Sequence, residues 1–406
     1  MRARLLATVV AILFLAPAAA AEHAPSTVPA YFTSRSYGPG KTARLLIEGR
    51  TQSIRGVVFQ AGPETRATWA PGTMNGVRVP DARLRLGPHG GTLTIGYWKS
   101  GLYFVRLTGP DGRVGYAPFV VRARPLGTSR VAVVLPTNTW QAYNFRDDDG
   151  DGVGNSWYAA PSVHTVELAR PFADRGVPPH FANYDQGFVR WLAHTDKSAD
   201  FLSDDDLERM SGDRLAALYD LIVFPGHEEY VTPHEYDAIE LYRNRGGNLM
   251  FLSANNFFWK VDKTGQVLQK IGKWRDVGRP EASLIGVQYR ANDDGQRQGL
   301  FTVQSASTAP WLWAGTGLGD GSTFGQYVGG YGIEIDATAP SSPPGTLVLA
   351  QIADLFGPGI TAQMSYYETA SGAKVFAAGT LDFGGSATFW PVKQILDNLW
   401  ARLSQP

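Results

Sequence analysis

The sequence predicts a three-layer α/β domain with a mostly parallel sheet, preceded by an all-β immunoglobulin-like sandwich. Residues 31–124 contain only short, β-rich segments separated by Gly- and Pro-containing turns. From residue 130 onwards, short apolar segments alternate with amphipathic ones that have helix start signals. Strands that alternate with helices are typical of a parallel sheet covered by right-handed crossover helices. We therefore expect the sandwich at 28–125 and the α/β domain at 130–406.

The first residues have the pattern of a signal peptide. Arg2 and Arg4 precede an apolar run at 5–15, and small residues follow up to Ala21. A basic start, a short apolar core and a small-residue cleavage site are typical of export signals. The run is too short for a bilayer-spanning helix. We expect cleavage of residues 1–21 and a secreted or periplasmic protein with no membrane attachment afterwards.

The composition excludes several classes of function. The chain has 406 residues and no Cys, which rules out disulfides, thiolate nucleophiles and Cys-ligated metal sites. Lys and Arg total 37, as do Asp and Glu, so the net charge is zero. Nucleic-acid-binding proteins usually have a basic excess, and no nucleic acid partner is expected. Neither a Gly-x-Ser-x-Gly motif nor a Gly-rich phosphate loop is present, which disfavours serine hydrolases and nucleotide-binding proteins.

The sandwich is predicted from its strands and turns. Five to seven short strands in roughly 95 residues fit an immunoglobulin-like sandwich. No reactive residues cluster in this region, so we expect a scaffold or contact domain. The clearest strands are expected at 43–48, 54–60, 93–98, 102–107 and 114–121.

The α/β domain is predicted from apolar strands and capped helices. Thr232 is expected to cap a helix with Pro233 at its first position and Glu235 at its third, which makes a capping box. Residues 257–373 are rich in Gly and polar residues and predict little regular structure. The expected strands are 130–135, 199–202, 221–224, 248–253 and 375–379, and the expected helices are 186–194, one starting at 204, 233–245 and 392–403.

Polar loops follow three of the predicted parallel strands, at 136–144, 226–230 and 253–259. The carboxyl ends of parallel strands share one sheet edge, where α/β proteins bind ligands. His227 and Glu229 are two apart on extended backbone, so their side chains should point to the same side. The alternative is that the aromatic residues are core and the polar ones cap helices. The predicted pocket combines His227 and Glu229 with Tyr143, Asn255, Trp140, Tyr230 and Trp259.

Four segments of the chain resemble the large (beta) subunit of N,N-dimethylformamidase and its relatives. The resemblance extends from about residue 130 to the C-terminus, and the preceding sandwich is similar to the β-domain that such proteins often carry. It implies a glutamine-amidotransferase-like α/β domain. The similar segments are TWQAYN at 139–144, GHEEY at 226–230, GGNLMFLSAN at 246–255 and VFAAGTLDF at 375–383.

The resemblance also implies a metal site. In the family a tyrosine, a histidine and a glutamate bind one non-haem iron that activates water for amide hydrolysis, and these match Tyr143, His227 and Glu229. Two oxygen ligands and one imidazole suit iron, with zinc second on ligand type alone. Glu334 matches an acidic position that would serve as general base or hold the substrate amine. Its alternative is an acid that pairs with a basic residue.

An acidic loop next to the first of these segments predicts calcium binding. Its acids occupy positions one, three and five of a calcium loop, with Gly152 at the tight turn. The twelfth position is Tyr158 instead of the usual glutamate. The alternative is a solvated acidic turn. The expected calcium ligands are Asp147, Asp149, Asp151, the carbonyl of Val153, and Asn155.

Two functions follow from these observations. The first is an exported, metal-dependent hydrolase of a small-molecule amide. The second is a non-catalytic exported protein that binds a ligand or carbohydrate through the aromatic pocket or the sandwich. No small partner subunit is evident, and a homo-oligomer is compatible with the sequence. The two functions differ in whether Tyr143, His227 and Glu229 converge on one point.

Overall fold

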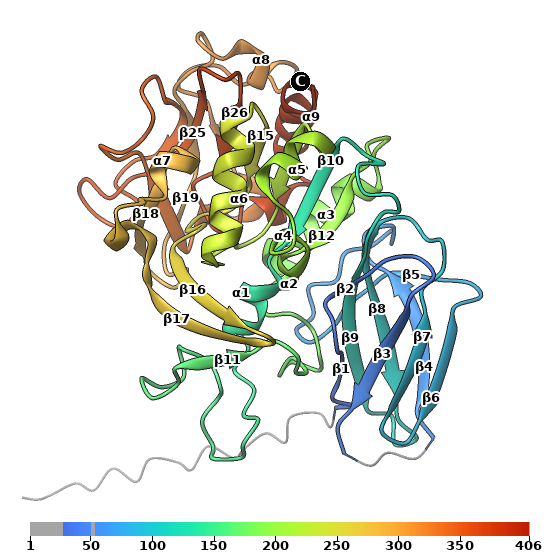
Figure 1. The fold of residues 1–406 in the computed structure, drawn as a ribbon. Coiled ribbons are helices and arrows are strands. Elements are labelled where there is room, and N and C mark those ends of the chain that lie inside the picture. The colour runs from blue at the N-terminus through green and yellow to red at the C-terminus, as the bar shows by residue number, and fades with distance from the viewer. Residues whose placement is uncertain (1–26, 50–52, 406) are drawn as a thin grey trace, which may run out of the picture.

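The structure is a computed structural model that describes residues 27–49 and 53–405. The expected signal peptide at 1–21 lies outside these residues. Figure 1 shows the N-terminal sandwich, in blue, beside a larger domain that holds the rest of the chain. None of the described helices has the length and apolar character needed to cross a bilayer.

The sandwich consists of two sheets that face each other. Four of the five predicted strands are present to within one residue, whereas the one expected at 93–98 is found at Gly90–Thr94 and overlaps the prediction by only two residues. The first sheet has the order β1 (Ala30–Phe32), β3 (Thr42–Ile47), β7 (Gly90–Thr94), β6 (Arg83–Gly87). The second has the order β2 (Ser36–Tyr37), β9 (Val114–Val121), β8 (Gly101–Thr108), β4 (Arg55–Gln60), β5 (Val77–Arg78).

Alternating side chains close the sandwich core. Leu45 and Ile47 of β3 point inward and are buried, as are Val105 and Leu107 of β8. The strand period of two residues places such alternate side chains on one face. The two sheets therefore share one apolar layer, as an immunoglobulin-like sandwich requires.

The larger domain is built on a sheet of nine strands. β10, β13 and β15 lie side by side and parallel at its centre, which puts the ends of all three at one edge. The strand order is β12 (Asp200–Ser203), β10 (Val131–Leu135), β13 (Leu221–Phe224), β15 (Asn248–Phe251), β26 (Lys374–Ala377), β25 (Ala362–Glu368), β24 (Leu347–Ile352), β20 (Phe301–Val303), β21 (Thr323–Phe324).

The predicted three-layer α/β domain with a mostly parallel sheet, of glutamine-amidotransferase type, is wrong. Only the four pairings from β12 to β26 are parallel, while the four from β26 to β21 are antiparallel. Strands make up 31% of the structure and helices 19%. The error arose in 257–373, where the strands are mostly short or polar, are separated by turns and pair over long sequence distances.

Further small sheets add to the strand content of this domain (Figure 1). One has four strands, in the order β11 (Thr165–Glu167), β17 (Val267–Lys273), β16 (Trp259–Thr264), β14 (Tyr230–Val231). Two others have two strands each: β18 (Gln288–Asn292) with β23 (Glu334–Ala337), and β19 (Gln298–Gly299) with β22 (Tyr331–Gly332).

Helices pack on both faces of the parallel half of the central sheet. Val133 of β10 faces the apolar cluster that includes α3 and α9, whereas Val134 faces the cluster that includes α5 and α6. The helices are α1 (Thr137–Ala142), α2 (Phe181–Tyr184), α3 (Gln186–Ala193), α4 (Asp204–Leu207), α5 (Gly212–Leu218), α6 (Pro233–Asn244), α7 (Ala282–Ile285), α8 (Pro310–Trp313) and α9 (Val392–Leu403). Short 3-10 turns occur at Trp274–Val277, Gln326–Val328 and Gly384–Ser386.

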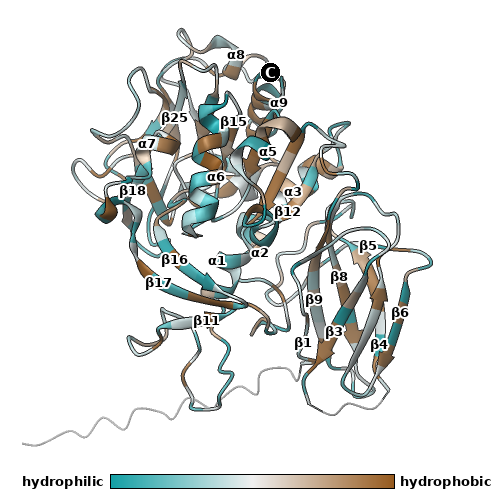
Figure 2. Ribbon diagram, in the orientation of Figure 1, coloured by the Kyte–Doolittle hydropathy of each residue, from teal (hydrophilic) through white to brown (hydrophobic). Residues whose placement is uncertain are grey.

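Helix α6 begins where its sequence predicts. The Thr232 side chain accepts a hydrogen bond from the Glu235 backbone N–H at 3.1 Å, and Glu235 accepts one from the Thr232 N–H at 2.8 Å. Tyr236, Ile239 and Tyr242 form its buried face, and Figure 2 shows α6 with both teal and brown residues. The predicted capping box is confirmed, and it fixes the chain directly after the loop that carries His227.

Candidate active site

Two segments bring the three predicted metal ligands together. β10 leads into α1, and Tyr143 lies at the C-terminal end of this helix. β13, the neighbouring parallel strand, leads into the turn with His227 and Glu229. The segment 136–144 is therefore not a loop as predicted but mostly a short, fully buried helix. Its register turns Tyr143 toward the end of β13.

The three side chains converge. Tyr143 Oη lies 2.8 Å from Glu229 Oε2 and 3.3 Å from His227 Nε2. His227 Nε2 lies 3.2 Å from Glu229 Oε2. These three atoms form a nearly equilateral triangle, so one small cation could contact all of them.

The orientation of His227 is set by the chain behind it. Its Nδ1 lies 3.1 Å from the carbonyl oxygen of Ala254, to which an Nδ1–H donates. This leaves Nε2 directed toward Glu229 and Glu334, 3.2 and 3.7 Å away. Burial lowers the pKa of His227, but the two carboxylates outweigh it and raise this pKa to about 9. The site therefore favours a positive charge at this point.

Glu334 faces the same point from a different segment. It follows Ile333, whose φ of 66° marks a left-handed turn, and it begins β23. Its Oε2 is buried without a hydrogen-bond partner among the described residues. Burial raises the pKa of Glu334 to about 7, with His227 lowering it and Glu229 raising it. A carboxyl group that titrates near neutrality can accept or donate a proton.

Asn255 holds Glu229 in place. It has a left-handed φ of 54°, and its backbone N–H donates to Asp336 Oδ1 at 2.9 Å. Its side-chain amide donates to Glu229 Oε1 at 3.0 Å. Asn255 therefore orients the carboxylate in the structure, and its direct contact with a substrate stays a prediction.

Tyr158 belongs to this site and was missed by sequence reasoning. Its ring stacks on Tyr143 with the centroids 4.6 Å apart. Its hydroxyl donates to Tyr143 Oη at 3.0 Å and lies 2.5 Å from Tyr230 Oη. In the sequence Tyr158 is only the twelfth residue of the acidic loop, and no spacing signal links it to Glu229, 71 residues further along the chain.

A cavity of about 340 Å³ is lined by Tyr143, His227 and Glu334, while Glu229 is buried behind them. Trp140 is part of its wall and donates its indole N–H to Asp185 Oδ2 at 3.3 Å. Of the other predicted wall residues, Tyr230 is fully buried, and Trp259 packs under Lys270 at 4.5 Å from its ring centroid. The lining residues are Thr139, Trp140, Tyr143, Pro179, His180, Asn183, Tyr184, Asp185, His227, Asn292, Asp294, Ile333, Glu334 and Leu381.

The three donor atoms have the spacing of ligands to one metal ion. Donors that bind an ion at about 2.1 Å and at right angles to each other lie about 3.0 Å apart. The triangle formed by Tyr143, His227 and Glu229 has sides of 2.8 to 3.3 Å. A hydrogen-bonded network without metal has similar distances, but Glu334 Oε2 then makes no hydrogen bond to a described residue and has only the ion pair with His227 Nε2 at 3.7 Å. The residues therefore fit one ion with open positions toward the cavity.

The acidic loop lies outside this site. The carboxylates of Asp147, Asp149 and Asp151 are exposed, with oxygen atoms within 4.8 Å of one another. Asp147 accepts hydrogen bonds from the N–H groups of Gly150 and Gly152, at 2.7 and 2.9 Å, which lowers the pKa of its carboxyl. The other two expected ligands are placed differently, since Val153 is exposed and Asn155 Oδ1 accepts the Asp148 N–H.

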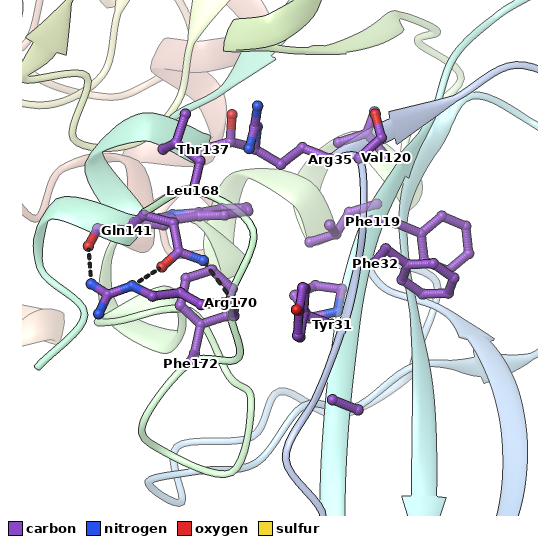
Figure 3. Close-up of a pocket in the computed structure, with 15 residues that line it drawn as sticks. Tyr31, Phe32, Arg35, Phe119, Val120, Thr137, Gln141, Leu168, Arg170 and Phe172 are labelled. Carbon is purple, nitrogen blue, oxygen red and sulfur yellow. Dashed lines mark hydrogen bonds between the residues drawn. The ribbon is translucent and has the colours of Figure 1, made fainter. Parts of the chain in front are cut away.

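A second, much smaller cavity lies where the sandwich meets the larger domain (Figure 3). Figure 3 shows Gln141 and Arg170 hydrogen-bonded on one side and Tyr31 and Phe119 on the other. Its volume of about 30 Å³ is close to the space of a single water. This cavity is therefore much smaller than the one lined by Tyr143 and His227.

Comparisons with known proteins agree with the resemblance of the motifs. The beta subunits of N,N-dimethylformamidase from Alcaligenes sp and Paracoccus aminophilus are each 23% identical to the chain over 259 residues. These alignments cover 50% of this chain and 34% of each relative, so the match extends over about a third of the relatives' length.

Among solved structures, the M1 domain of titin covers 24% of this chain with 14% identity, and the ZirS C-terminal domain covers 30% with 11% identity. The two matches cover 94% of the titin domain and 88% of the ZirS domain. Both have a TM-score of 0.16, which is too low to indicate a shared fold. The family model for N,N-dimethylformamidase beta subunit-like, C-terminal, by contrast, matches residues 54–394. The chain therefore belongs to the N,N-dimethylformamidase beta subunit-like, C-terminal family.

Proposed function

We propose that this protein hydrolyses the C–N bond of a small-molecule amide, with Tyr143, His227 and Glu229 holding one iron ion. The observation that carries the proposal is the triangle of donor atoms with sides of 2.8 to 3.3 Å at the edge of a cavity. Membership in a family named after an amidase supports the reaction class. The chain matches only about a third of its curated relatives' length, so the activity itself is part of the proposal.

The chemistry of the donors favours a hard cation. A phenolate, a carboxylate and an imidazole suit ferric iron best, with zinc as the second choice. When bound, the ion polarises the amide carbonyl and lowers the pKa of water. In the protein alone, burial and Glu229 keep the pKa of Tyr143 well above its ordinary value. Metal binding at this site therefore requires that Tyr143 and His227 lose their protons, which makes it pH-dependent.

The protein side chains transfer the proton and position the reacting groups. Glu334 Oε2, which makes no hydrogen bond among the described residues, accepts the proton of the attacking water. The water oxygen bonds to the carbonyl carbon, the C–N bond breaks, and Glu334 passes the proton to the departing amine nitrogen. Asn255 keeps Glu229 turned toward His227. The buried walls of the cavity limit the access of other water molecules.

Location and assembly are part of the same proposal. Export rests on the signal-like segment at 1–21, outside the described residues. The relatives bear the name beta subunit, which is compatible with an oligomer or with a partner. Calcium at the acidic loop would be a structural cofactor in this proposal.

Metal analysis and a hydrolysis assay test the proposal together. The purified protein should contain close to one iron or zinc per chain and should release dimethylamine and formate from N,N-dimethylformamide. His227→Ala should retain less than about a tenth of both the metal and the activity, because a ligand is lost. His89→Ala, a change at an exposed histidine on the sandwich, should alter neither. Equal metal content in the two variants would refute the site.

The alternative is a non-catalytic exported protein that binds a ligand in the same cavity. It is favoured by the fact that hydrogen bonds alone account for the contacts of Tyr143 with Glu229 and His227. A protein that binds amides with equal affinity before and after metal removal, and hydrolyses none of them, would support this alternative.

A further inference from the structure

A second hollow adjoins the active-site cavity on the side of the sandwich. It has a volume of about 420 Å³. Tyr143, Pro179, His180 and Asn183 line both hollows, so the two share a common wall. One of the shared residues is a proposed metal ligand. A molecule bound at the metal could therefore extend into the second hollow.

Two exposed aromatic side chains line this second hollow. Trp69 is 57% exposed and Phe145 is 52% exposed. Trp69 comes from the loop between β4 and β5 of the sandwich, whereas Phe145 comes from the segment after α1. Large apolar rings in contact with water are unfavourable, and a group of them at a concave surface marks a binding site.

The loop that carries Trp69 is fixed to the larger domain. The neighbouring Thr68 donates its N–H to Gln186 Oε1 at 3.0 Å, and Gln186 Nε2 donates back to the Thr68 carbonyl at 2.9 Å. Gln186 is only 3% exposed and belongs to α3. Gly72, three residues after Trp69, lies so close to Asp174 that a Cβ on this glycine would be 2.2 Å from Asp174 Oδ1. Trp69 is thus held at the hollow by contacts on both sides.

Phe145 is fixed in a similar way. The preceding Asn144 is 1% exposed, and its side chain donates to the Pro171 carbonyl and to Gln141 Oε1, both at 2.9 Å. The backbone of Phe145 packs against Gly154, where a Cβ would lie 2.5 Å from the Phe145 carbonyl oxygen. The backbone at Trp69 and at Phe145 is therefore held in place by contacts, while the faces of both rings are exposed to solvent.

The rest of the lining indicates which chemical group would bind. Most of the wall is apolar, and Asn144 already uses its side chain in two hydrogen bonds. The exposed faces of Trp69 and Phe145 offer a planar apolar ring stacking surfaces. The polar lining residues are Thr73, Tyr143, Asn144, Asp174, His180 and Asn183.

We propose that the Trp69–Phe145 hollow is a subsite for an aromatic ring, and that the substrate is an amide with an aryl substituent. This inference rests on the proposed amide hydrolysis for its reaction, but the subsite itself is independent of it. The metal site would act on the amide group while Trp69 and Phe145 hold the ring. A substrate without the ring would leave the second hollow unused.

Two formamides that differ in one group test the subsite. N-methylformanilide has a phenyl group where N,N-dimethylformamide has a methyl group. Trp69→Ala should lower kcat/KM for N-methylformanilide about 10-fold, as expected for the loss of one aromatic contact, and change that for N,N-dimethylformamide less than about twofold. Trp69→Phe should restore most of the loss. Trp390→Ala, a change at a 51% exposed tryptophan that lines neither hollow, should leave both values unchanged. Equal effects of Trp69→Ala on both amides would overturn the subsite.

Binding measurements separate the subsite from the reaction. Saturation-transfer NMR should show phenyl protons of N-methylformanilide in contact with the wild-type protein, and a weaker signal with Trp69→Ala at unchanged melting temperature. If neither amide is hydrolysed but this difference is seen, the proposed reaction fails and the subsite stands. If N,N-dimethylformamide is hydrolysed and the phenyl signal is the same in both proteins, the reaction stands and the subsite fails.

Discussion

Asp185 is the residue where burial and charge conflict most clearly. It lies between α2 and α3, is 1% exposed, and faces the backbone of Gly226 in the turn before His227. Its Oδ2 accepts one hydrogen bond from Trp140, while Oδ1 has no partner among the described residues. Burial raises the pKa of Asp185 to about 7, although Trp140 and His227 lower it. The folded protein therefore holds a proton here that the unfolded chain releases near pH 4.

We expect the free energy of unfolding to fall between about pH 4 and 7 because of Asp185. In this range the folded state binds one proton more than the unfolded state, so rising pH favours unfolding, by up to about 4 kcal/mol for this group. Asp185→Asn keeps the shape and an acceptor for Trp140 but removes the proton. The free energy of unfolding of the variant minus that of wild type should therefore be larger at pH 8 than at pH 5, by about 2–4 kcal/mol. Urea unfolding at both pH values measures this.

Asp196→Asn provides the control, because its side chain is 98% exposed. It should have the same effect on stability at pH 5 and pH 8. An Asp185→Asn variant that behaves in the same way would show that this carboxyl titrates normally.

The site residues that could be predicted are those with local signals. His227 and Glu229 follow an apolar strand directly and precede a capping box, and both patterns are visible in the sequence. Tyr158 and Asp185 carry no such signal, because their place in the site depends on how loops fold back over long sequence distances. Glu334 was indicated only by the family resemblance, since the left-handed residue of the turn that aims it into the cavity is Ile333 and not a glycine.

At the scale of elements, prediction succeeded where burial is continuous. β13 and β10 are buried at every residue, and β-rich apolar runs of this kind are typical of parallel strands. β25, by contrast, reads AQMSYYE, and its pairing with β24 contains an irregularity. Such strands are recognised only from their neighbours in the sheet, which the sequence does not give. This is why the antiparallel half of the central sheet was missed.

The acidic loop after α1 gives a prediction at the same scale. Its three carboxylates lie within 4.8 Å of one another, and the segment leads on to Tyr158, which stacks on Tyr143. Calcium binding there stays a prediction. A calcium ion at a hundredfold excess over its Kd adds about 2.7 kcal/mol to the free energy of unfolding. The entropy of unfolding of a chain of this size is about 0.8 kcal/mol per kelvin. A calcium chelator should therefore lower the melting temperature by about 3 °C.

Asp149→Ala should abolish this shift, because it removes one of the three carboxylates, whereas Asp196→Ala should preserve it. Differential scanning calorimetry with and without chelator measures the effect. If the chelator does not change the melting temperature of the wild-type protein, the loop does not bind calcium and is a solvated acidic turn.

At the scale of the whole molecule, the sandwich and the larger domain are joined by a shared apolar cluster, which includes Leu102 and Val120 of the sandwich, and by buried charges. Asp205 of α4 forms ion pairs with Arg35 of the sandwich and Lys263 of β16. The three side chains are only 7%, 11% and 10% exposed. Burial alone would raise the pKa of Asp205, but the two cations lower it below its ordinary value. One carboxylate thus links three separate parts of the chain.

Asp205→Ala should therefore uncouple the two parts of the protein. It would leave two buried cations without their partner, which typically costs about 3–5 kcal/mol. The control is Asp213→Ala, which breaks the exposed pair with Arg245, whose side chains are 61% and 59% exposed, and should cost less than about 1 kcal/mol. Thermal unfolding should show one transition for the control and two for Asp205→Ala, because the sandwich has its own apolar core and can melt separately. Equal stability of the two variants would mean that the joint depends on apolar contacts and not on Asp205.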